Sequence, residues 1–554
     1  MSLFNQHKEI LDKAIQANKE RGFHAQYPEH PKAYGEDGAE KGLEKFNGML
    51  DSNYEGLLQT GEYDHVGEEE SPFWQKPLGI KYPAFKTNDL VSNANTAFNS
   101  WRNTSIDERA GILLESLERI KDRFFEIAYA TMHTSGQSFM MSFQASGPHA
   151  NDRALEAVAM AYEELNRFSS NVRWVKPMGK FSITLDKDYI PVPKGISLAI
   201  GCSTFPIWNT VPGVFASLAT GNPVICKPHQ GSILPIAIVV EEIQKVLKES
   251  GKDINTIQLA ADTSENLITK ELTENKEVKI IDYTGGSSFG DYVESLAGKT
   301  VFTEKAGVNS LILDSVEEID AVMGNIAFSV SLYSGQMCTA PQNIFIPEGG
   351  IRAGDEQLSY EQVIEKLKDH VQGLAGNPKM GAGTLAAIQN ETTLERVNSS
   401  SSLGGHVVLE PVAVVNEEFE GARTSAPTIM EVNADDSDIY EQELFGPIVL
   451  VIKTNDTEHS IQLAKEMASK HGAITCLAYT TDDNVASRIT EEMNSVFVPV
   501  SFNLTGFIWV NQHAAFSDFH VTGGNPAGNA SFTNPDFVGR RFVWVGNRKF
   551  VSQE

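Results

Sequence analysis

Cysteine is scarce in this sequence, and its four residues lie far apart. They are Cys202, Cys226, Cys338 and Cys476, and none belongs to a CxxC pair. This spacing argues against a disulfide framework and against a zinc site of the finger or ribbon type. Other metal-ligand clusters and internal repeats are also missing, so we predict no bound metal. A reducing, cytoplasmic environment is the expectation that follows.

Basic residues are also few, with 45 Lys and Arg against 73 Asp and Glu and a net charge of −28. A surface of this sign repels nucleic acids and anionic membranes, so we expect neither as a partner. Any anionic ligand must then be met by a local basic pocket. The N-terminus has no apolar run of the signal-peptide kind. The most apolar stretch, 195–226, is interrupted by proline and glycine, which predicts buried strands and a helix and not a membrane span.

A chain of 554 residues is too long for one compact core and predicts two or three domains. Residues 1–80 begin with an amphipathic pattern at Ile10, Leu11, Ala14 and Ile15 and continue as a Gly-, Glu- and Pro-rich segment. Two interpretations stay open for this segment. It is an arm that lies over the core, or a flexible acidic linker.

Cys338 stands apart from the other cysteines because it lies between small or flexible residues, just before the apolar run 343–346. A structural cysteine more often sits inside an apolar run. A thiolate attacks carbonyl carbon well, and nearby backbone N–H dipoles lower its pKa and stabilise the oxyanion that it creates. Taken alone, Cys338 is weak evidence, and an inert thiol is the more common interpretation.

Glu304 lies 34 residues before Cys338 (338 minus 304), at the end of an apolar segment. A thiol and a carboxylate near a flexible turn suit two steps. The thiolate attacks a carbonyl, and water then attacks the thioester with Glu304 as general base. Without Cys338, a solvated loop glutamate would be the simpler interpretation.

These residues resemble two motifs of the aldehyde dehydrogenase superfamily. There the general base opens a Glu-Leu-Gly-Gly-Lys type motif, and the nucleophile closes a Gly-Gln-x-Cys motif at the same separation. Here the motifs begin at Glu304 (Glu-Lys-Ala-Gly) and end at Cys338 (Gly-Gln-Met-Cys). The similarity runs from about residue 80 to the C-terminus.

The resemblance implies an α/β fold with two doubly wound domains and a β-hairpin oligomerisation element. The pattern of strands at 196–200, 223–227 and 278–284 between helices independently fits a doubly wound cofactor domain. The expected division is listed in chain order: an N-terminal extension at 1–80, a dinucleotide-binding domain at 81–175 and 196–303, a catalytic domain at 304–505, and bridging or oligomerisation elements at 176–195 and 506–554.

Thr204 departs from the family pattern. The family usually has Asn-Phe-Pro where this chain has Thr-Phe-Pro, and the asparagine amide joins the nucleophile's own N–H in the oxyanion hole. A threonine hydroxyl is shorter and must turn its single proton the right way, and losing one oxyanion donor typically costs about a hundredfold or more in rate. Asn209 lies about one helical turn further along the chain. It is either a substitute for the missing oxyanion donor or simply a polar residue on a helix face.

Lys227 and Gln230 carry the cofactor prediction. They lie where the family has Lys-Pro-x-Glu, with the lysine near the adenosine ribose and the glutamate accepting from its 2′-hydroxyl. A carboxylate there would repel a 2′-phosphate, whereas the neutral amide of Gln230 beside an ammonium would not. We therefore predict NADP as the cofactor, with NAD as the alternative.

Further cofactor contacts are predicted in two motifs. Gly285, Gly286 and Gly290 follow the strand 278–284 and resemble the family's Phe-Thr-Gly-Ser turn, where backbone N–H groups approach a pyrophosphate at a helix N-terminus. Glu443 and Phe445 match the family's Glu-x-Phe-Gly-Pro. There the glutamate holds the nicotinamide ribose and the phenylalanine lies against the nicotinamide.

Several other segments have expected positions. A capping box at Ser105 and Glu108 predicts a helix whose apolar face continues to Ile127. Strands within 176–195 resemble a hairpin that pairs with the C-terminal strand 541–545, and exposed edges of this kind favour a homodimer or homotetramer. Residues 507–513 resemble the family's Trp-Val-Asn strand beside the substrate tunnel.

The function predicted from these features is NADP-dependent oxidation of a small-molecule aldehyde to the acid. The Thr-Phe-Pro-Ile-Trp variant and the extension look most like the PaaN-type proteins of phenylacetate or benzoate breakdown, which implies a semialdehyde, CoA-linked or free. Two alternatives stay open. One is a CoA-acylating aldehyde dehydrogenase, against which Glu304 argues. The other is a non-catalytic binding protein on the same scaffold, for which Thr204 argues.

Overall fold

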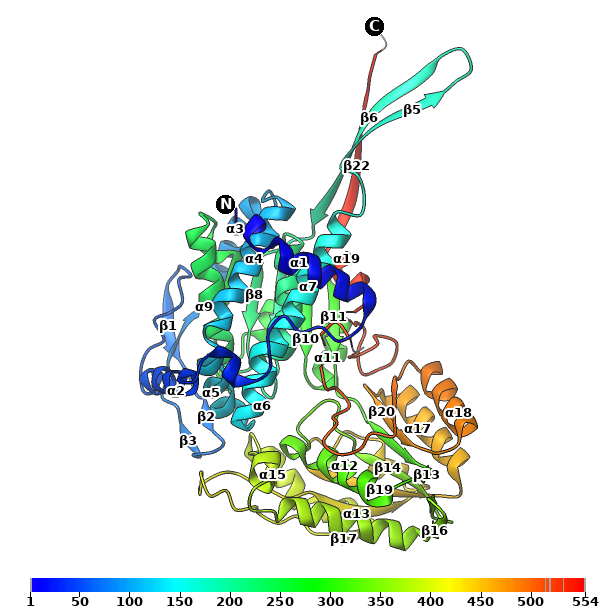
Figure 1. Ribbon diagram of the computed structural model, residues 1–554. Helices are drawn as coiled ribbons and strands as arrows, with labels where there is room; N and C mark the ends of the chain where they lie inside the picture. The colour runs from blue at the N-terminus through cyan, green and yellow to red at the C-terminus, as the bar shows by residue number, and fades with distance from the viewer. Residues whose placement is uncertain (1, 514, 518–519, 532, 553–554) are drawn as a thin grey trace.

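The chain forms two α/β lobes, and a three-stranded arm projects from the first of them (Figure 1). The computed structural model describes residues 2–513, 515–517, 520–531 and 533–552. Among these residues, no helix is both long and apolar enough to cross a membrane.

The first lobe is built on a five-stranded parallel sheet in the order β11-β10-β7-β8-β9. The strands are β7 (Ile196–Ile200), β8 (Val224–Lys227), β9 (Ile257–Leu259), β10 (Val278–Thr284) and β11 (Thr300–Glu304). Most of their residues are buried, as expected for a parallel sheet that is covered on both faces. The strand order reverses between β7 and β10, and in such sheets ligands bind at the carboxyl ends of the strands beside that point.

The second lobe is built on a seven-stranded sheet in the order β17-β18-β19-β14-β12-β20-β21. Its strands are β12 (Ser310–Leu313), β14 (Asn343–Pro347), β17 (His406–Leu409), β18 (Thr428–Asn433), β19 (Ile448–Thr454), β20 (Cys476–Tyr479) and β21 (Val500–Phe502). The edge strand β17 is antiparallel and the other pairs are parallel. The two lobes agree with the doubly wound α/β fold that the sequence predicts.

Helices cover both faces of each sheet and make separate apolar cores. In the second lobe, α12 (Ile319–Ser331) and α13 (Tyr360–Ala375) pack on one face, while α17 (Thr457–His471) and α18 (Asp483–Ser495) pack on the other. In the first lobe, α8 (Pro206–Ala219) and α9 (Leu234–Glu249) share a core with the N-terminal helices. The chemistry of the protein lies where these two lobes meet.

The helix predicted from Ser105 to Ile127 is two helices in the structure, α4 (Ile106–Lys121) and α5 (Phe124–Ser135). Ser105 caps α4 as expected, because its hydroxyl accepts a hydrogen bond from the Glu108 N–H at 3.2 Å. The break follows from a tight turn in which the Arg123 N–H donates to the Ile120 carbonyl at 2.9 Å. Apolar spacing continues across the turn and therefore could not reveal it.

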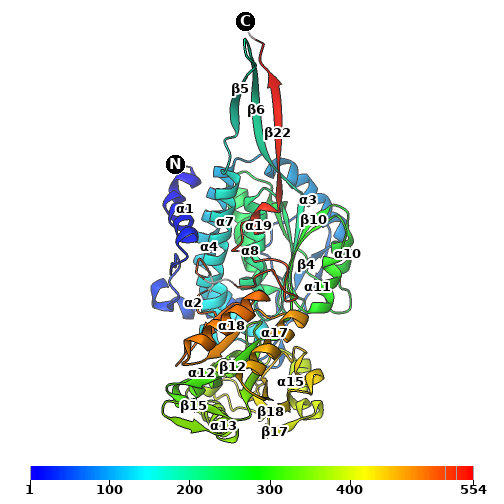
Figure 2. The same cartoon turned by 90° about the vertical axis from the view of Figure 1, so that its right-hand side faces the viewer.

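The projecting arm consists of β5 (Asn171–Pro177), β6 (Ser182–Pro193) and β22 (Phe542–Phe550), and it extends well away from the lobes (Figure 2). The predicted pairing with the C-terminal strand is confirmed, since Val543 lies opposite Val192. The predicted position of the hairpin is wrong, because its first strand, β5, ends at Pro177 and lies mostly before the predicted range 176–195. Gly179, with φ of 77°, makes the turn earlier than the alternating pattern suggested.

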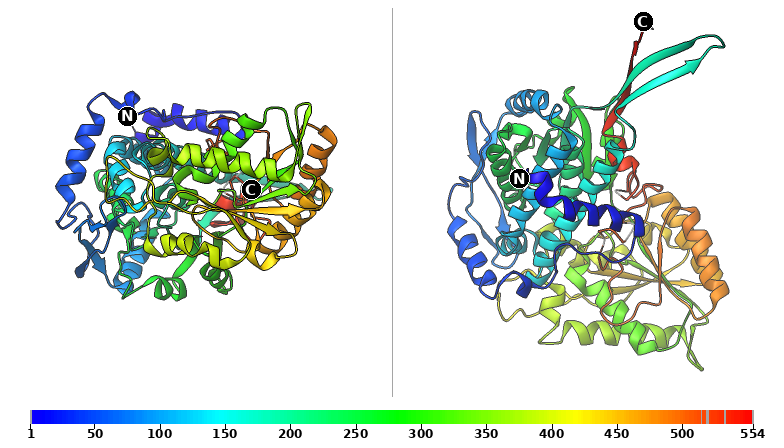
Figure 3. Two further views of the ribbon diagram at one scale, coloured as in Figure 1. Left: turned by 90° about the horizontal axis from the view of Figure 1, so that it is seen from below. Right: turned by 45° about the horizontal axis from the view of Figure 1, so that its top comes forward.

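Residues 1–80 pack on the first lobe as an arm, the first of the two interpretations. The helix α1 (Leu3–Glu20) lies along α4 and α7 (Ala150–Leu165) (Figure 3). Its residues Leu11 and Ala14 are fully buried in the same core as those helices. The amphipathic pattern of the first twenty residues thus reflects burial against the folded core.

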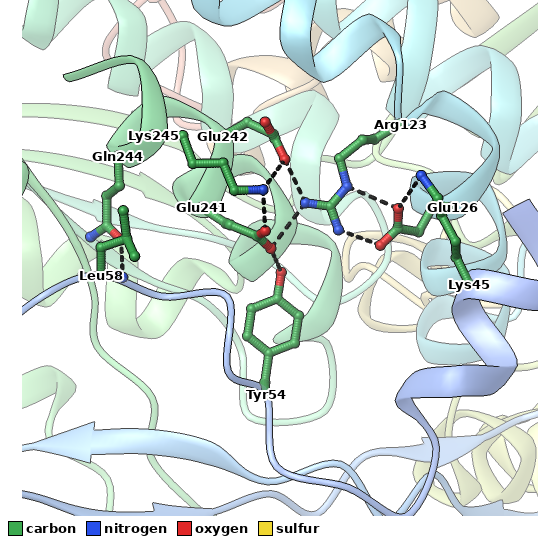
Figure 4. Close-up of polar contacts among 9 residues, drawn as sticks. All are labelled: Lys45, Tyr54, Leu58, Arg123, Glu126, Glu241, Glu242, Gln244 and Lys245. Carbon is green, nitrogen blue, oxygen red and sulfur yellow. Dashed lines mark hydrogen bonds and ion pairs between the residues drawn. The ribbon is translucent and has the colours of Figure 1, made fainter. Parts of the chain in front are cut away.

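A polar cluster anchors the middle of this extension to α5 and α9 (Figure 4). The Tyr54 hydroxyl donates to Glu241, and the guanidinium of Arg123 lies 2.9 Å from Glu241 and 2.7 Å from Glu242. Arg123 also bonds Glu126 on its own helix. Because these groups are largely buried, each depends on its partners for solvation.

Candidate active site

The loop that carries Cys338 leaves α12 through three successive residues with left-handed backbone. Tyr333, Ser334 and Gly335 have φ of 52°, 51° and 62°. A Cβ on Gly335 would lie 2.6 Å from the Gly446 carbonyl oxygen, so only glycine fits there. Such a strained turn persists only where its surroundings hold it, and it is common at functional sites. Here the hydroxyls of Tyr333 and Ser334 donate to backbone carbonyls on other segments.

Two side-chain amides then fix the loop on either side of the thiol. Asn309 donates to the carbonyls of Cys338 at 2.7 Å and Ala340 at 3.1 Å. Gln336 donates to the Ala387 carbonyl at 3.0 Å and is fully buried. The backbone of Cys338 is thereby held from the second lobe and from the loop before α15 (Glu391–Asn398).

Glu304 ends β11 and reaches the same point from the first lobe. Its carboxylate accepts hydrogen bonds from Asn209 Nδ2 at 3.0 Å and from His520 Nε2 at 3.1 Å. The ligand atoms of Glu304, Cys338 and His520 all lie within 4.8 Å of one another. The structure therefore brings together the two residues that the sequence paired, and it adds His520.

His520 is the functional residue that the sequence did not reveal. Its Nε2 lies 3.7 Å from Cys338 Sγ, and its Nδ1 lies 3.3 Å from Asn511 Nδ2. The Asn511 amide donates to Nδ1, so the neutral ring carries its proton on Nε2 and donates it to Glu304. The ring also packs edge-on against Trp208, with 4.8 Å between centroids. No motif in the sequence marked this histidine.

The pKa values of Cys338 and Glu304 are shifted in opposite directions. Burial raises the pKa of the Cys338 thiol well above its ordinary value, and the negative charge of Glu304 adds to the effect. Burial also raises the pKa of Glu304, but His520 and the guanidinium of Arg153 outweigh it, so the net pKa of Glu304 is lowered. The resting site thus holds a protonated thiol beside an ionised carboxylate.

A cavity of about 390 Å³ reaches Cys338 from one side. Apolar side chains dominate its wall: Met140, Met141, Phe205, Trp208, Phe328, Leu332, Met337, Phe507 and Trp509. The strand predicted for 507–513 is wrong, since these residues form turns along the cavity. The Asn325 amide bonds the carbonyls of Gly506 and Ile508, which therefore do not enter a sheet.

A second cavity of about 240 Å³ reaches Cys338 and Glu304 from the other side. It runs between the Gly285–Gly286 turn and the pair Glu443 and Phe445, and Thr204 also lines it. Gly286 is the N-cap of α11 (Ser287–Glu294), and a Cβ on it would meet nothing within 4 Å.

The donor set of this second cavity fits a nicotinamide dinucleotide. Open backbone at a helix N-terminus suits a pyrophosphate. At the far end, burial raises the pKa of Glu443 to about 7, and this carboxyl can accept ribose hydroxyls. The cavity meets Cys338 at that end.

Three predicted cofactor residues do not line either of these cavities. Gly290 is buried, and a Cβ on it would lie 2.4 Å from Lys305 Cδ, so this glycine serves close packing. Lys227 is 2 % exposed and its ammonium lies 2.7 Å from Asp262. Gln230 is half-buried in the turn after β8.

Thr204 and Asn209 occupy different positions relative to the thiol. Thr204 lines only the second cavity, and its carbonyl accepts from Gln137 Nε2 at 2.7 Å. Asn209 lines both cavities and holds Glu304. An oxyanion role for Thr204 stays a prediction, while Asn209 is the side-chain amide placed between the two cavities.

A thiol and a carboxylate between an apolar cavity and a dinucleotide-binding crevice define a cysteine-dependent oxidoreductase of aldehydes. The chain belongs to the aldehyde dehydrogenase family, whose family model matches residues 81–530. Members of this family are NAD(P)-dependent enzymes. The matched range begins where the N-terminal extension ends.

Known proteins support this assignment. The crystal structure of an NAD-dependent aldehyde dehydrogenase from Burkholderia multivorans is 42 % identical, covers both chains completely and has a TM-score of 0.97. An α-ketoglutarate semialdehyde dehydrogenase from Haloferax volcanii is 26 % identical over 83 % of this chain and 91 % of its own. A 1-pyrroline-5-carboxylate dehydrogenase from Halalkalibacterium halodurans is 24 % identical over 68 % and 70 %.

Proposed function

We propose that this enzyme oxidises an aldehyde to the carboxylic acid through a thioester on Cys338. The observation that carries the proposal is the position of Cys338 where two cavities meet, with Glu304 and His520 beside it. An aldehyde fits the apolar cavity, and the cofactor fits the other.

In the first step, Glu304 takes the proton of the Cys338 thiol while the sulfur bonds to the aldehyde carbon. The carbonyl oxygen becomes the oxyanion of a thiohemiacetal. Donors placed around it are worth about a hundredfold or more in rate. Asn209 is the amide nearest to this point on the side of Glu304, and it becomes available when the carboxylate is protonated.

The nicotinamide, when bound, supplies the hydride acceptor for the oxidation. Glu443 would hold its ribose and Phe445 would lie against its ring, because both line the second cavity with Cys338. Loss of hydride from the thiohemiacetal carbon leaves a thioester on Cys338.

Hydrolysis then needs an ionised, well-oriented base. Glu304 first releases the thiol proton to solvent and is ionised again. It then takes a proton from water, the hydroxide bonds to the acyl carbon, and the carbon–sulfur bond breaks to release the carboxylic acid, after which the proton on Glu304 returns to the Cys338 thiolate. His520 holds one carboxylate oxygen and Asn209 the other. These two donors favour water as the acyl acceptor, which argues against the CoA-acylating alternative. A non-catalytic binding protein on the same scaffold would have no need for them.

NADP stays the predicted cofactor because Gln230 is neutral. One feature argues for NAD instead. The carboxylate of Asp262 pairs with Lys227 at 2.7 Å and would repel a 2′-phosphate. The ratio of kcat/KM for NADP and NAD decides between them. If NAD is preferred, Asp262→Asn should shift the ratio toward NADP.

The substrate proposed from the sequence is an aldehyde of aromatic-acid breakdown. Its support is the apolar wall of the first cavity, in which Phe205, Trp208 and Trp509 provide aromatic surface. The names of the relatives from Haloferax volcanii and Halalkalibacterium halodurans denote semialdehyde and pyrroline-carboxylate dehydrogenases, which supports aldehyde oxidation more broadly.

The test is formation of reduced cofactor with aliphatic, aromatic and CoA-linked aldehydes, each with NADP or NAD and with or without free CoA. Turnover without CoA is expected, and Cys338→Ala should abolish it. Turnover that requires CoA would remove Glu304 from the role of base for water. Cofactor binding without turnover of any aldehyde would favour the scaffold alternative.

A further inference from the structure

The N-terminal extension contributes a carboxylate to the aldehyde cavity. Glu29 lines this cavity together with Cys338, although it lies outside the range matched by the family model. Its side chain is 52 % exposed, whereas Cys338 is only partly exposed. Glu29 therefore marks the end of the cavity that opens to solvent.

Glu29 is held in place by a contact of its own side chain and by hydrogen bonds of the backbone before it. Its Oε2 lies 2.8 Å from Nε2 of His149, and this contact lowers the pKa of Glu29. The Gln26 N–H donates to Asp152 on α7 at 3.1 Å. On the other side, His513 donates from Nε2 to the His24 carbonyl at 3.0 Å. The segment is thus held between α7 and the tail loop.

Histidine is the only basic residue type beside this carboxylate in the described part of the cavity wall. Among the described residues that line the cavity, His149 and His520 are present and none is lysine or arginine. Arg153 lies near the catalytic end, but its guanidinium stacks 3.4 Å from the ring centroid of Trp208, and the indole therefore lies between it and the cavity. A substrate carboxylate at the open end would lose water against an apolar wall and face Glu29.

We propose that Glu29 makes the enzyme selective for aldehydes with no negative charge at the end remote from the carbonyl. The favoured class has an apolar aliphatic or aromatic body and a neutral or cationic far end, which excludes the free-acid semialdehyde that the sequence resemblance implies. This inference rests on the proposed function, because it requires that the apolar cavity admits the aldehyde. It gives the extension a role in specificity that is separate from the chemistry at Cys338.

The experiment compares three aldehydes of one chain length at pH 8.5, where histidine is neutral: hexanal, 6-oxohexanoate and 6-(trimethylammonio)hexanal. In the wild-type enzyme, kcat/KM for 6-oxohexanoate is expected to be about tenfold or more below the other two. Raising the salt from 0.05 to 1 M should reduce this difference, because the screening length falls to about 3 Å.

The variant Glu29→Gln should raise kcat/KM for 6-oxohexanoate relative to hexanal by roughly three- to tenfold. Glu36→Gln is the matched control, since Glu36 is an exposed glutamate of the same extension that does not line the cavity. It should leave the ratio unchanged. The salt series tests the same idea without any variant.

The outcomes separate the two proposals. Turnover of hexanal with equal or better turnover of 6-oxohexanoate would overturn the selectivity and leave aldehyde oxidation standing. The selectivity would also be overturned, with aldehyde oxidation left standing, if Glu29→Gln and Glu36→Gln shifted the ratio of kcat/KM values equally. Absence of turnover with all three aldehydes, in protein that binds cofactor, would overturn the proposed function and the selectivity with it.

Discussion

At the scale of single residues, Glu304 acts on two different acids, the thiol of Cys338 and a water molecule. The raised pKa of Cys338 and the lowered pKa of Glu304 make the first proton transfer unfavourable on its own. The transfer therefore completes only when carbon–sulfur bond formation consumes the thiolate. This coupling keeps the free thiol protonated, and a protonated thiol is a poor nucleophile toward oxidants and alkylating agents.

Glu304→Gln is expected to lower steady-state kcat by about a hundredfold or more, because the amide cannot activate water. At high pH, where the thiol of Cys338 ionises without a base, the variant should still give one equivalent of reduced cofactor in a burst. Stopped-flow absorbance measures both phases. A variant that keeps wild-type turnover, or that gives no burst even at high pH, would contradict the two-step role.

His520→Leu is expected to move the acid limb of the kcat profile to higher pH. His520 lowers the pKa of Glu304, so its removal raises that pKa, and a higher pH is then needed to ionise the base. His520→Gln keeps an N–H donor near the position of Nε2 but carries no charge, so it should restore only part of the wild-type profile. If both variants lose activity equally at every pH, His520 holds the loop and does not set the base.

Cys338 and Glu304 were found from the sequence because Glu304 begins one short motif, Cys338 ends another, and each motif is local in the chain. His520 contacts Glu304 across 216 residues, and Asn309 reaches Cys338 only where β12 and β14 pair in the second sheet. No spacing rule links such partners. The reacting pair was therefore predictable, and the residues that orient it were not.

At the scale of elements, the Arg123 cluster joins the N-terminal extension to α5 and α9 (Figure 4). The carboxylates of Glu126, Glu241 and Glu242 converge on one guanidinium, which has 14 % of its side chain exposed. These contacts raise the pKa of Arg123 despite its burial. The charge is thus stable only while all three carboxylates stay in place.

Arg123→Leu is expected to destabilise the protein by about 3–5 kcal/mol, because it leaves buried carboxylates without their cation. Tyr54→Phe, which removes one donor to Glu241, should cost about 1–3 kcal/mol. Lys45→Ala is the control, since its ammonium is exposed and lies 3.9 Å from Glu126, and its cost should be about 0–1 kcal/mol. Urea unfolding measures all three, and equal effects would contradict a buried cluster.

Element types were predicted well where a pattern stayed local. Alternation and apolar runs gave β7, β8 and β10 close to their actual bounds. The turn at Arg123, the turn at Gly179 and the irregular segment 507–513 escaped prediction. In the first two cases one local hydrogen bond or one positive φ overrides the apolar pattern, and in the third the hydrogen bonds come from Asn325, which is far away in the sequence.

At the scale of the whole molecule, the outer edges of the arm of β5, β6 and β22 pair with no other strand among the residues that the structure describes. Its surface exposes large apolar side chains: Val172, Val175, Phe181, Ile190, Val192, Val543, Val545 and Phe550. Exposed strand edges with apolar faces are normally covered by another chain. We therefore propose a homodimer or homotetramer assembled through this arm. The apolar arm would supply the attraction that holds the copies together, because the net charge of −28 makes them repel one another.

Val543→Lys is expected to shift the protein toward smaller assemblies, because an ammonium in an apolar contact between copies is costly to desolvate. Val543 is 53 % exposed within one chain, so the substitution should change the unfolding free energy of the single chain by about 0.5 kcal/mol or less. Asn547→Ser, farther along the same strand, is the control and should leave the assembly intact. Light scattering after size exclusion gives the mass of each variant across a dilution series. A wild-type protein that stays monomeric at every concentration would show that the arm is not an assembly surface, and the exposed apolar strand would then need another partner.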